Sequence, residues 1–391
     1  MTAHKAGPLK MPLYPYAVKA NSSAKRALVR YRLPMDNLRV EKSPVPMMIR
    51  AISVLCLMLF TQSAISQLSA ERGDGVAINP LVEEPGQVEF KEWLVPWEDS
   101  RPRDPDVAPN GVIWLVGQGG DYAARFDPET EQFRRKDLPP GTGPHNIIID
   151  FDGTLWIAGN RQAFIGRMNS MSGELQRYAL PEEGARDPHT LVFAGDNEIW
   201  FTLQWGNATG RFNKRSGDID LVPMPVDLAR PYGIKVDSKG HPWIALLGTN
   251  ALATINPQDM ALQTIYLPRE NARLRRLAIT QDDKIWYADY AQGYIGLYDP
   301  ETGEFSEWKT PSENSLPYAM AIDPLDRIWF VETGPQPNQL VGFDPASEIF
   351  FSVTPIPNGG GSVRNMVYDP NRNSLWFGTD TNFLTQAILP E

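Results

Sequence analysis

The sequence predicts an all-β fold, a seven-bladed β-propeller of four-stranded blades in which an N-terminal strand completes the last blade. Three observations lead to this prediction. A tryptophan recurs about every 43 residues, short β-rich segments separated by turns lie between the tryptophans, and a segment near the N-terminus matches an outer strand of a later repeat. Repeats of this length are typical of propellers, solenoids and arrays.

The repeat is marked by seven tryptophans, 42 to 47 residues apart: Trp114, Trp156, Trp200, Trp243, Trp286, Trp329 and Trp376. Each unit contains four short segments rich in β-branched and aromatic residues, with turn signals such as Asp152-Gly153 between them and no helical period. Four strands per unit are typical of a propeller blade. Because each tryptophan sits at the same place in an apolar strand, we expect all seven in the core between blades.

The last unit has only three strands before the chain ends. The missing fourth strand is predicted at the other end, because VEFKEWLVP at residues 88–96 matches GEFSEWKTP at residues 303–311. We therefore expect the propeller to span residues 88–391. Pairing of its two ends closes the ring and removes an exposed sheet edge.

Residues 48–66 have the layout of a signal peptide: one arginine, an unbroken apolar run over 52–60, and small residues before Gln67. The run is too short to span a bilayer, since a transmembrane helix needs roughly 20 residues. We expect cleavage after Ser66 or Ala70, no membrane span after cleavage, and a periplasmic or secreted protein.

The flanking segments show no repeat pattern. Residues 1–47 are basic and proline-rich, and we expect them to be either untranslated, with Met47 or Met48 as the initiator, or a disordered extension. Residues 67–87 are expected to be a linker.

The charge of the expected mature chain limits its partners. Without residues 1–66, 27 Lys and Arg face 45 Asp and Glu, a formal charge near −18. Such acidity argues against nucleic acid and anionic membrane surfaces as partners. The only cysteine, Cys56, lies in the signal segment, so disulfides and thiolate chemistry are not expected. We expect a monomer that binds a small molecule.

The repeat also predicts which residues line the central mouth. Within a blade the first two strands form a hairpin, so the start of the first strand and the end of the second share one rim near the axis. Eleven residues before each tryptophan, this first position holds Arg103, His145, His189, Tyr232, Arg275, Tyr318 and, with a one-residue slip, Arg364. Two residues earlier come Arg101, Gly143, Asp187, Arg230, Arg273, Leu316 and Ser362.

Six arginines thus gather at one predicted mouth of an acidic protein. A guanidinium group offers a rigid fork that suits carboxylate or phosphate oxygens. We expect an anionic or carbonyl-rich ligand to be bound by Arg103, Arg230, Arg273, Arg275, Arg364, Tyr232 and Tyr318. The alternative is a crown of salt bridges without a ligand, in which Asp289 and Glu332, from the second strands, pair with these arginines.

Two histidines, His145 and His189, occupy the same rim position in adjacent blades. A histidine there can act as a general base near neutral pH. His241 lies in a turn that we expect on the opposite face.

The third unit, DPHTLVFAGDNEIWFTLQWGNATGRF, resembles the repeat of the virginiamycin B lyase family, propellers that inactivate streptogramins. The resemblance runs from about residue 88 to the C-terminus. It implies opening of an ester-containing ring by elimination, with His189 as the base, His145 as a second rim histidine and a Mg²⁺ ion held by acidic residues. Asp187 matches the acidic residue two positions before that base.

The sequence departs from the family at the metal. Leu203 stands where the family repeat has a glutamate, and leucine cannot bind Mg²⁺, which takes oxygen ligands. The candidate ligands are then Asp187 and the neutral side chain of Gln204, a weak set for possible Mg²⁺.

Two functions follow from these residues. The first is a periplasmic lyase-type enzyme, acting by elimination on a carbonyl-containing, anionic small molecule. The second is a non-catalytic propeller that binds a ligand or protein through the arginine-rich mouth. A gluconolactonase-type propeller fits less well, because that class has six blades and acidic or amide ligands at its axis.

Overall fold

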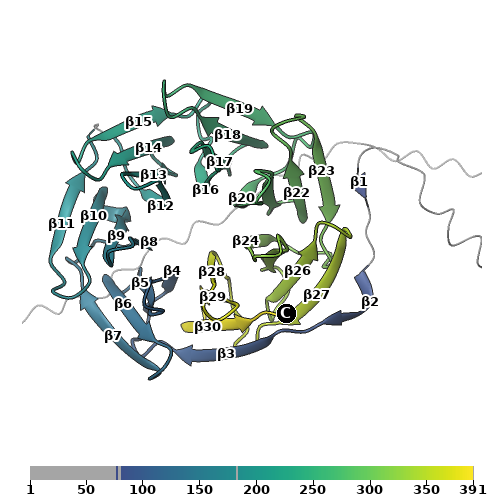
Figure 1. Cartoon of the computed structure of the whole chain (residues 1–391), viewed down its shortest axis with the longest axis horizontal. Helices are drawn as coiled ribbons and strands as arrows, with labels where there is room; N and C mark the ends of the chain where they lie inside the picture. Colours follow the sequence, from purple (N-terminus) through teal and green to yellow (C-terminus); the bar gives the residue numbers. More distant parts are fainter. Residues whose placement is uncertain (1–75, 78–80, 182–183, 391) are drawn as a thin grey trace, which may run out of the picture. The chain divides into compact units, whose positions relative to one another are not determined.

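The computed structural model describes residues 76–77, 81–181 and 184–390, and it confirms the predicted all-β propeller. Figure 1 shows seven sheets arranged around a central axis. The expected signal peptide at 48–66 and the extension at 1–47 lie outside the described residues. No helix in the described part of the chain is long and apolar enough to cross a lipid bilayer.

Each of the first four blades is a four-stranded antiparallel sheet that starts at the axis and ends at the outer wall. Blade one contains β4 (Pro102–Val107), β5 (Ile113–Gly117), β6 (Tyr122–Asp127) and β7 (Gln132–Asp137). Blade two contains β8 (Ile147–Ile149), β9 (Thr154–Gly159), the short 3-10 helix η1 (Asn160–Gln162), β10 (Phe164–Asn169) and β11 (Leu175–Ala179). Blade three contains β12 (Pro188–Ala194), β13 (Glu198–Leu203), β14 (Ala208–Asn213) and β15 (Ile219–Pro223). Blade four contains β16 (Pro231–Val236), β17 (Pro242–Leu246), β18 (Ala251–Ile255) and β19 (Leu262–Tyr266).

The last three blades also include strands from the N-terminal segment. Blade five contains β20 (Leu274–Ile279), β21 (Ile285–Asp289), β22 (Tyr294–Tyr298) and β23 (Phe305–Lys309), with β1 (Val76–Ala77) added outside. Blade six contains β24 (Pro317–Ile322), β25 (Ile328–Glu332), β26 (Gln339–Asp344) and β27 (Ile349–Pro355), with β2 (Leu81–Gly86) added outside. Blade seven contains β28 (Met366–Asp369), β29 (Ser374–Gly378), β30 (Phe383–Ile388) and β3 (Glu89–Leu94).

The ring is closed by β3, which pairs antiparallel with β30 from Glu89 opposite Ile388 to Leu94 opposite Phe383. In Figure 1 the dark blue β3 runs along the outer side of the yellow β30. The Trp93 ring stacks on Trp376 with a centroid distance of 5.5 Å, which fastens the two ends of the chain through their side chains as well.

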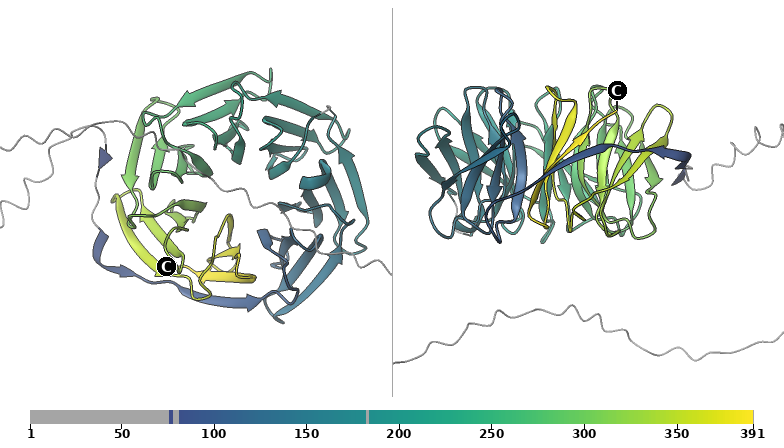
Figure 2. Two further views of the ribbon diagram at one scale, coloured as in Figure 1. Left: turned by 180° about the vertical axis from the view of Figure 1, so that it is seen from behind. Right: turned by 90° about the horizontal axis from the view of Figure 1, so that it is seen from below.

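The interval 67–87, expected to be a linker, contains the strands β1 and β2. Both pair in parallel with the outer strands β23 and β27. Figure 2 shows β2 beside the outer wall of the ring. An outer strand has unpaired backbone groups on one side, and a chain that passes along it satisfies some of them. These two strands could not be predicted from the repeat, because their pairing depends on the outer wall of the ring.

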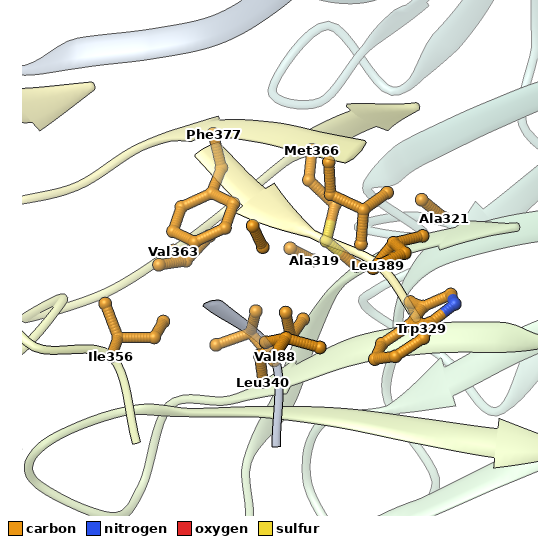
Figure 3. Packing of buried hydrophobic residues seen from close by; sticks show 13 residues of the cluster. Val88, Ala319, Ala321, Trp329, Leu340, Ile356, Val363, Met366, Phe377 and Leu389 are labelled. Carbon is orange, nitrogen blue, oxygen red and sulfur yellow. The ribbon is translucent and has the colours of Figure 1, made fainter. Parts of the chain in front are cut away.

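The core consists of side chains packed between neighbouring blades, as the tryptophan repeat predicts. Five of the repeat tryptophans are at most 2% exposed, and Trp114 and Trp243 are 5% exposed. In four blades the indole N–H donates to an aspartate in the turn before it, for example Trp329 Nε1 to Asp323 Oδ2 at 2.8 Å. Figure 3 shows one such cluster, in which Trp329 and Leu340 of blade six meet Met366 and Phe377 of blade seven.

A β-bulge interrupts the first strand near its N-terminal end in blades one, three, four, five and six. In blade five, for example, the register shifts between Leu274 and Leu277. A bulge inserts extra residues on one strand and breaks the strict alternation of side chains between two faces. In blades one, three and five, two consecutive side chains at the bulge therefore face the axis: Arg103 and Asp104, His189 and Thr190, and Arg275 and Arg276.

Closure can be tested with Trp93→Ala. Trp93 is half-buried between β3 and Trp376, so we expect its removal to lower the free energy of unfolding by about 2 to 3 kcal/mol, less than for a fully buried tryptophan. Denaturant unfolding of the two proteins measures this loss. The neighbouring Leu94 is 60% exposed, and Leu94→Ala should cost less than about 0.5 kcal/mol. Equal effects of the two substitutions would contradict the role of Trp93 in closure.

Candidate functional site

A buried guanidinium group on the axis, that of Arg276 in β20, joins four blades. Its Nη2 donates to Asp104 Oδ2 of blade one at 3.2 Å, and its Nη1 donates to Thr190 Oγ1 of blade three at 2.9 Å. Its Nε donates to the backbone carbonyl oxygen of Arg364 in blade seven at 2.8 Å. Arg276 and Asp104 are 3% and 2% exposed. The ion pair therefore crosses the middle of the ring away from water.

The sequence analysis missed Arg276, Asp104 and Thr190. Each directly follows a predicted rim residue, and regular alternation would point it away from the axis. The bulge turns it inward instead. A signal was available, since the residue after each rim position is polar or small in every blade: Asp104, Asn146, Thr190, Gly233, Arg276, Ala319 and Asn365.

Above this ion pair, five of the predicted rim residues form a continuous row. Arg103 Nη2 donates to His145 Nε2, and the His145 ring lies 3.7 Å from the His189 ring between centroids. His189 is 4.1 Å from the Tyr232 ring, and the Tyr232 and Tyr318 hydroxyl groups are hydrogen-bonded. All five are at most 5% exposed. The structure therefore brings together Arg103, His145, His189, Tyr232 and Tyr318.

His145 is held as a neutral hydrogen-bond acceptor. Arginine has only donors, so His145 Nε2 must accept from Arg103 and the ring proton must sit on Nδ1. That nitrogen is 3.9 Å from Asp104 Oδ2 and has no hydrogen-bond partner in the described residues. Burial, with the nearby Arg103 and His189, holds the pKa of His145 well below its usual range. Its free electron pair is already engaged, so it cannot act as the base without losing Arg103.

His189 has one nitrogen fixed and one available. Its Nδ1 is hydrogen-bonded to Thr190 Oγ1 at 2.9 Å, whereas Nε2 makes no hydrogen bond within the described part of the chain. Burial, together with Arg276, Arg103 and Arg275, holds the pKa of His189 well below its usual range. When Thr190 accepts from Nδ1–H, the ring presents an unprotonated Nε2.

Arg275 lies against the tyrosine end of this row. Its Nη1 donates to the Tyr318 hydroxyl oxygen at 2.9 Å, and its guanidinium carbon lies 4.0 Å from the Tyr290 ring centroid and 4.3 Å from that of Tyr318. Its Nε is buried without a hydrogen-bond partner in the described residues. Arg275 is half-buried, so it is the member of the group that solvent reaches.

The other predicted arginines lie farther out. Arg364 forms a two-pronged salt bridge with Asp380, which also lies 3.9 Å from Arg101 Nε. Arg230 stacks on the exposed Trp205 ring at 4.4 Å, and Arg273 donates to backbone carbonyl oxygens of its own loop. Neither has a described hydrogen bond or ring contact with the row. Arg101 and Arg230 adopt left-handed backbone angles, with φ of 49° and 53°, which turn the chain at the rim.

The expected salt bridges of Asp289 and Glu332 with the rim arginines are not present among the described residues. Asp289 lies 3.3 Å from Arg269 and accepts backbone N–H groups, one of them from Arg273. Glu332 accepts hydrogen bonds from Ser312. Asp104 and Asp380 are the carboxylates that pair with the mouth arginines.

The expected Mg²⁺ ligands do not form a site that fits the ion. Asp187 accepts from Asn160 Nδ2 through one carboxylate oxygen and from the Trp205 backbone N–H, at 3.0 Å, through the other. Leu203 is fully buried, and Gln204 has no described hydrogen bond. Within the described residues no group of three His, Cys, Asp or Glu side chains is placed to hold a metal. Asp187 instead fixes the rim loop of blade three.

On the far side of Arg276 the axis widens into a cavity of ≈ 340 Å³. Aliphatic side chains such as Ile147 and Ile234 line it together with polar groups, among them Asp106, Lys235 and Asn146. Burial raises the pKa of Asp106 to about 6. Arg276 thus separates this cavity from the row of histidines and tyrosines.

Comparisons with known proteins agree with this architecture. A model of the virginiamycin B lyase family matches residues 82–334 and 219–384. The solved structure of virginiamycin B lyase from Staphylococcus aureus is 21% identical, with a TM-score of 0.71, over 78% of this chain and 100% of that one. A catalytically inactive variant of that enzyme with quinupristin gives 21% identity, a TM-score of 0.70, and coverage of 78% and 100%.

A more distant propeller is also similar. The WD40 domain of Doa1 is 15% identical, with a TM-score of 0.64, over 78% of this chain and 98% of that one. No curated protein sequence matches the chain. At such identities the likeness to solved structures shows the fold alone.

The axial ion pair can be tested with Asp104→Asn. This substitution leaves Arg276 and Arg103 buried without their carboxylate, and we expect it to lower the free energy of unfolding by about 3 to 5 kcal/mol. The half-exposed rim carboxylate provides the control, since Asp380→Asn should cost about 1 kcal/mol or less. Denaturant unfolding curves of both variants measure the difference. A similar loss of unfolding free energy in the two variants would show that the axial ion pair stabilises the fold no more than the rim pair does.

Proposed function

Because the chain belongs to the virginiamycin B lyase family, we propose that it is a lyase-type enzyme that acts by elimination on a carbonyl-containing, anionic small molecule. The observation that carries this proposal is the state of His189. It is neutral, fixed through Nδ1 by Thr190, and has Nε2 free beside three guanidinium groups. A positioned histidine that stays unprotonated at neutral pH is suited to general base catalysis.

The proposed reaction needs no water. His189 Nε2 removes a proton from the carbon next to the ligand's carbonyl group. The electron pair of that C–H bond forms a C=C double bond to the next carbon, and the C–O bond on that carbon breaks so that the oxygen leaves as a carboxylate. The proton passed to His189 is later released to solvent.

Positive charge near the carbonyl oxygen favours this step, because negative charge develops there as the proton leaves. Arg275 is the arginine best placed to supply it, being half-buried and free of a carboxylate partner among the described residues. Arg103 and Arg276 increase the positive potential from below. His145, engaged by Arg103, acts here by positioning the His189 ring against which it packs.

The proposal includes the setting in which the enzyme works. The layout of residues 48–66 supports export to the periplasm or medium, and the acidity of the remaining chain favours a small-molecule ligand over nucleic acid. We propose that it acts as a monomer.

A second candidate function, ligand or protein binding without chemistry, is favoured by one observation. Leu203 and the engaged Asp187 leave no carboxylate set for the metal that the family resemblance implies. In that case the same mouth would hold an anion through Arg275 and release it unchanged.

His189→Ala tests the proposed base. We expect it to lower turnover of a cyclic ester substrate by about 10² to 10⁴-fold, the usual contribution of a general base. His241→Ala, on a turn far from the row, is the control and should leave turnover unchanged. The product of elimination has the mass of the substrate, whereas hydrolysis adds one water, so mass spectrometry separates the two reactions. Unchanged turnover in His189→Ala would rule out this mechanism.

The pH dependence of turnover gives an independent test. A base is active when unprotonated, and the pKa of His189 lies well below its usual range of about 6.5. Turnover should therefore stay constant as the pH falls through 6.5 and decline only at lower pH. A decline centred on the ordinary histidine pKa, measured as kcat/KM against pH, would contradict the burial and charge of this site.

Arg275→Ala separates the two candidate functions. For the enzyme, we expect a loss of about 10-fold or more in kcat/KM, because a charge-assisted contact is worth about 1.5 to 3 kcal/mol. For a binding protein, calorimetry would show affinity lost in this variant while the ligand recovered from the unmodified protein is chemically unchanged.

A further inference from the structure

The mouth holds more positive charge than its carboxylates neutralise. Five guanidinium groups share two carboxylates: Arg103 and Arg276 face Asp104, Arg101 and Arg364 face Asp380, and Arg275 has no ion pair in the described residues. Both histidines are neutral. Buried charge without a partner is costly, so another negative group is expected at the axis.

The hydrogen bonds allow Tyr232 to be that group. Arg275 donates to the Tyr318 hydroxyl oxygen, so the Tyr318 O–H is free to donate to Tyr232. The Tyr232 oxygen is then the last acceptor of the chain, and no described residue accepts a proton from it. A phenolate at Tyr232 satisfies this arrangement.

The surroundings of Tyr232 are cationic on several sides. Arg275 and Arg276 of β20 lie with their guanidinium carbons 5.4 and 5.3 Å from its ring centroid, and Arg103 of β4 adds a third charge. His189 of β12 and Tyr318 of β24 are the titratable neighbours, and Arg364 is also close enough to act on it. Burial alone raises the pKa of Tyr232, but the three arginines more than offset it and the pKa is lowered. The opposite holds for Tyr318, whose pKa burial and Tyr232 raise.

We propose that Tyr232 serves as an internal anion of the mouth, and that a carboxylate ligand replaces its negative charge, so that ligand binding is coupled to uptake of one proton by Tyr232. The two negative groups compete for the same arginines. At a pH above the pKa of Tyr232, its phenolate balances Arg275 and Arg276 in the ligand-free protein. When a carboxylate binds to Arg275, Tyr232 takes a proton and becomes neutral. This inference rests on the anionic ligand of the proposed function but is independent of the elimination step.

The coupling has a defined sign. Below the pKa of Tyr232 the tyrosine is already neutral, and carboxylate affinity should not depend on its titration. Above that pKa each binding event must add a proton, so the affinity should fall by about tenfold per pH unit.

The test uses the tyrosinate band in the near-ultraviolet absorbance of the full chain. We expect one tyrosine to ionise below the ordinary pKa of about 10, and Tyr232→Phe to remove this component. Tyr287→Phe is the matched control, because Tyr287 is equally buried but bonds to Glu307 outside the mouth, and its ionisation is shifted to higher pH. Tyr318→Phe keeps Tyr232 but removes the hydroxyl group that donates a hydrogen bond to it, so the low-pH ionisation should move to higher pH. This variant replaces Tyr232→Phe in the test if Tyr232→Phe does not fold.

Sodium acetate is then added above the Tyr232 pKa, with sodium chloride at equal ionic strength as the control. We expect acetate to reduce the tyrosinate absorbance and chloride to have no such effect, with Arg275→Met weakening the acetate response at least 10-fold. A low-pH component that survives in Tyr232→Phe, or no acetate effect on the absorbance, would overturn the proposal. The readout needs no turnover, so failure of the elimination reaction would leave this result intact.

Discussion

The architecture of the site depends on one buried contact, the ion pair of Arg276 and Asp104 on the axis. Each blade contributes its first strand to the centre of the ring. Arg276 bonds to three other blades, at Asp104, Thr190 and the Arg364 carbonyl, and so fixes their inner ends relative to one another. Thr190 in turn holds His189. Arg276 therefore helps to set the orientation of the proposed base through Thr190.

The same contact explains how an acidic protein keeps a positively charged centre. Most of its carboxylates lie on the outer strands and turns, where water screens them. At the axis, burial limits the number of carboxylates, and those present are already shared between guanidinium groups. Neutral histidines, together with Tyr232 and Tyr318, fill the remaining space, which makes the mouth compact and leaves Arg275 as its most accessible charge.

The fold could be predicted from the sequence because its causes repeat. Seven tryptophans in equivalent strands set the number of blades, and the match of residues 88–96 to 303–311 identified β3 as an outer strand. The rim position eleven residues before each tryptophan identified Arg103, both histidines, Tyr232 and Tyr318.

The features that could not be predicted arise where the chain departs from the repeat. The bulges turned Arg276 and Asp104 inward, and the left-handed backbone at Arg230 directed the rim chain away from the row. Asp187 was expected to bind Mg²⁺, but its carboxylate oxygens accept hydrogen bonds from Asn160 and from the Trp205 backbone.

The pairing of β3 with β30 has a consequence for how the molecule forms. Its partners, such as Leu94 and Phe383, are separated by nearly the whole propeller sequence. Contacts this distant along the chain are slow to form, since the intervening segment must be ordered first. The four antiparallel strands of each of the first six blades come from one continuous segment, whereas those of the seventh require both ends of the chain at once. The last event in folding is therefore expected to be the docking of the N-terminal segment, and a nascent chain that lacks its final strand would expose two sheet edges until synthesis is complete.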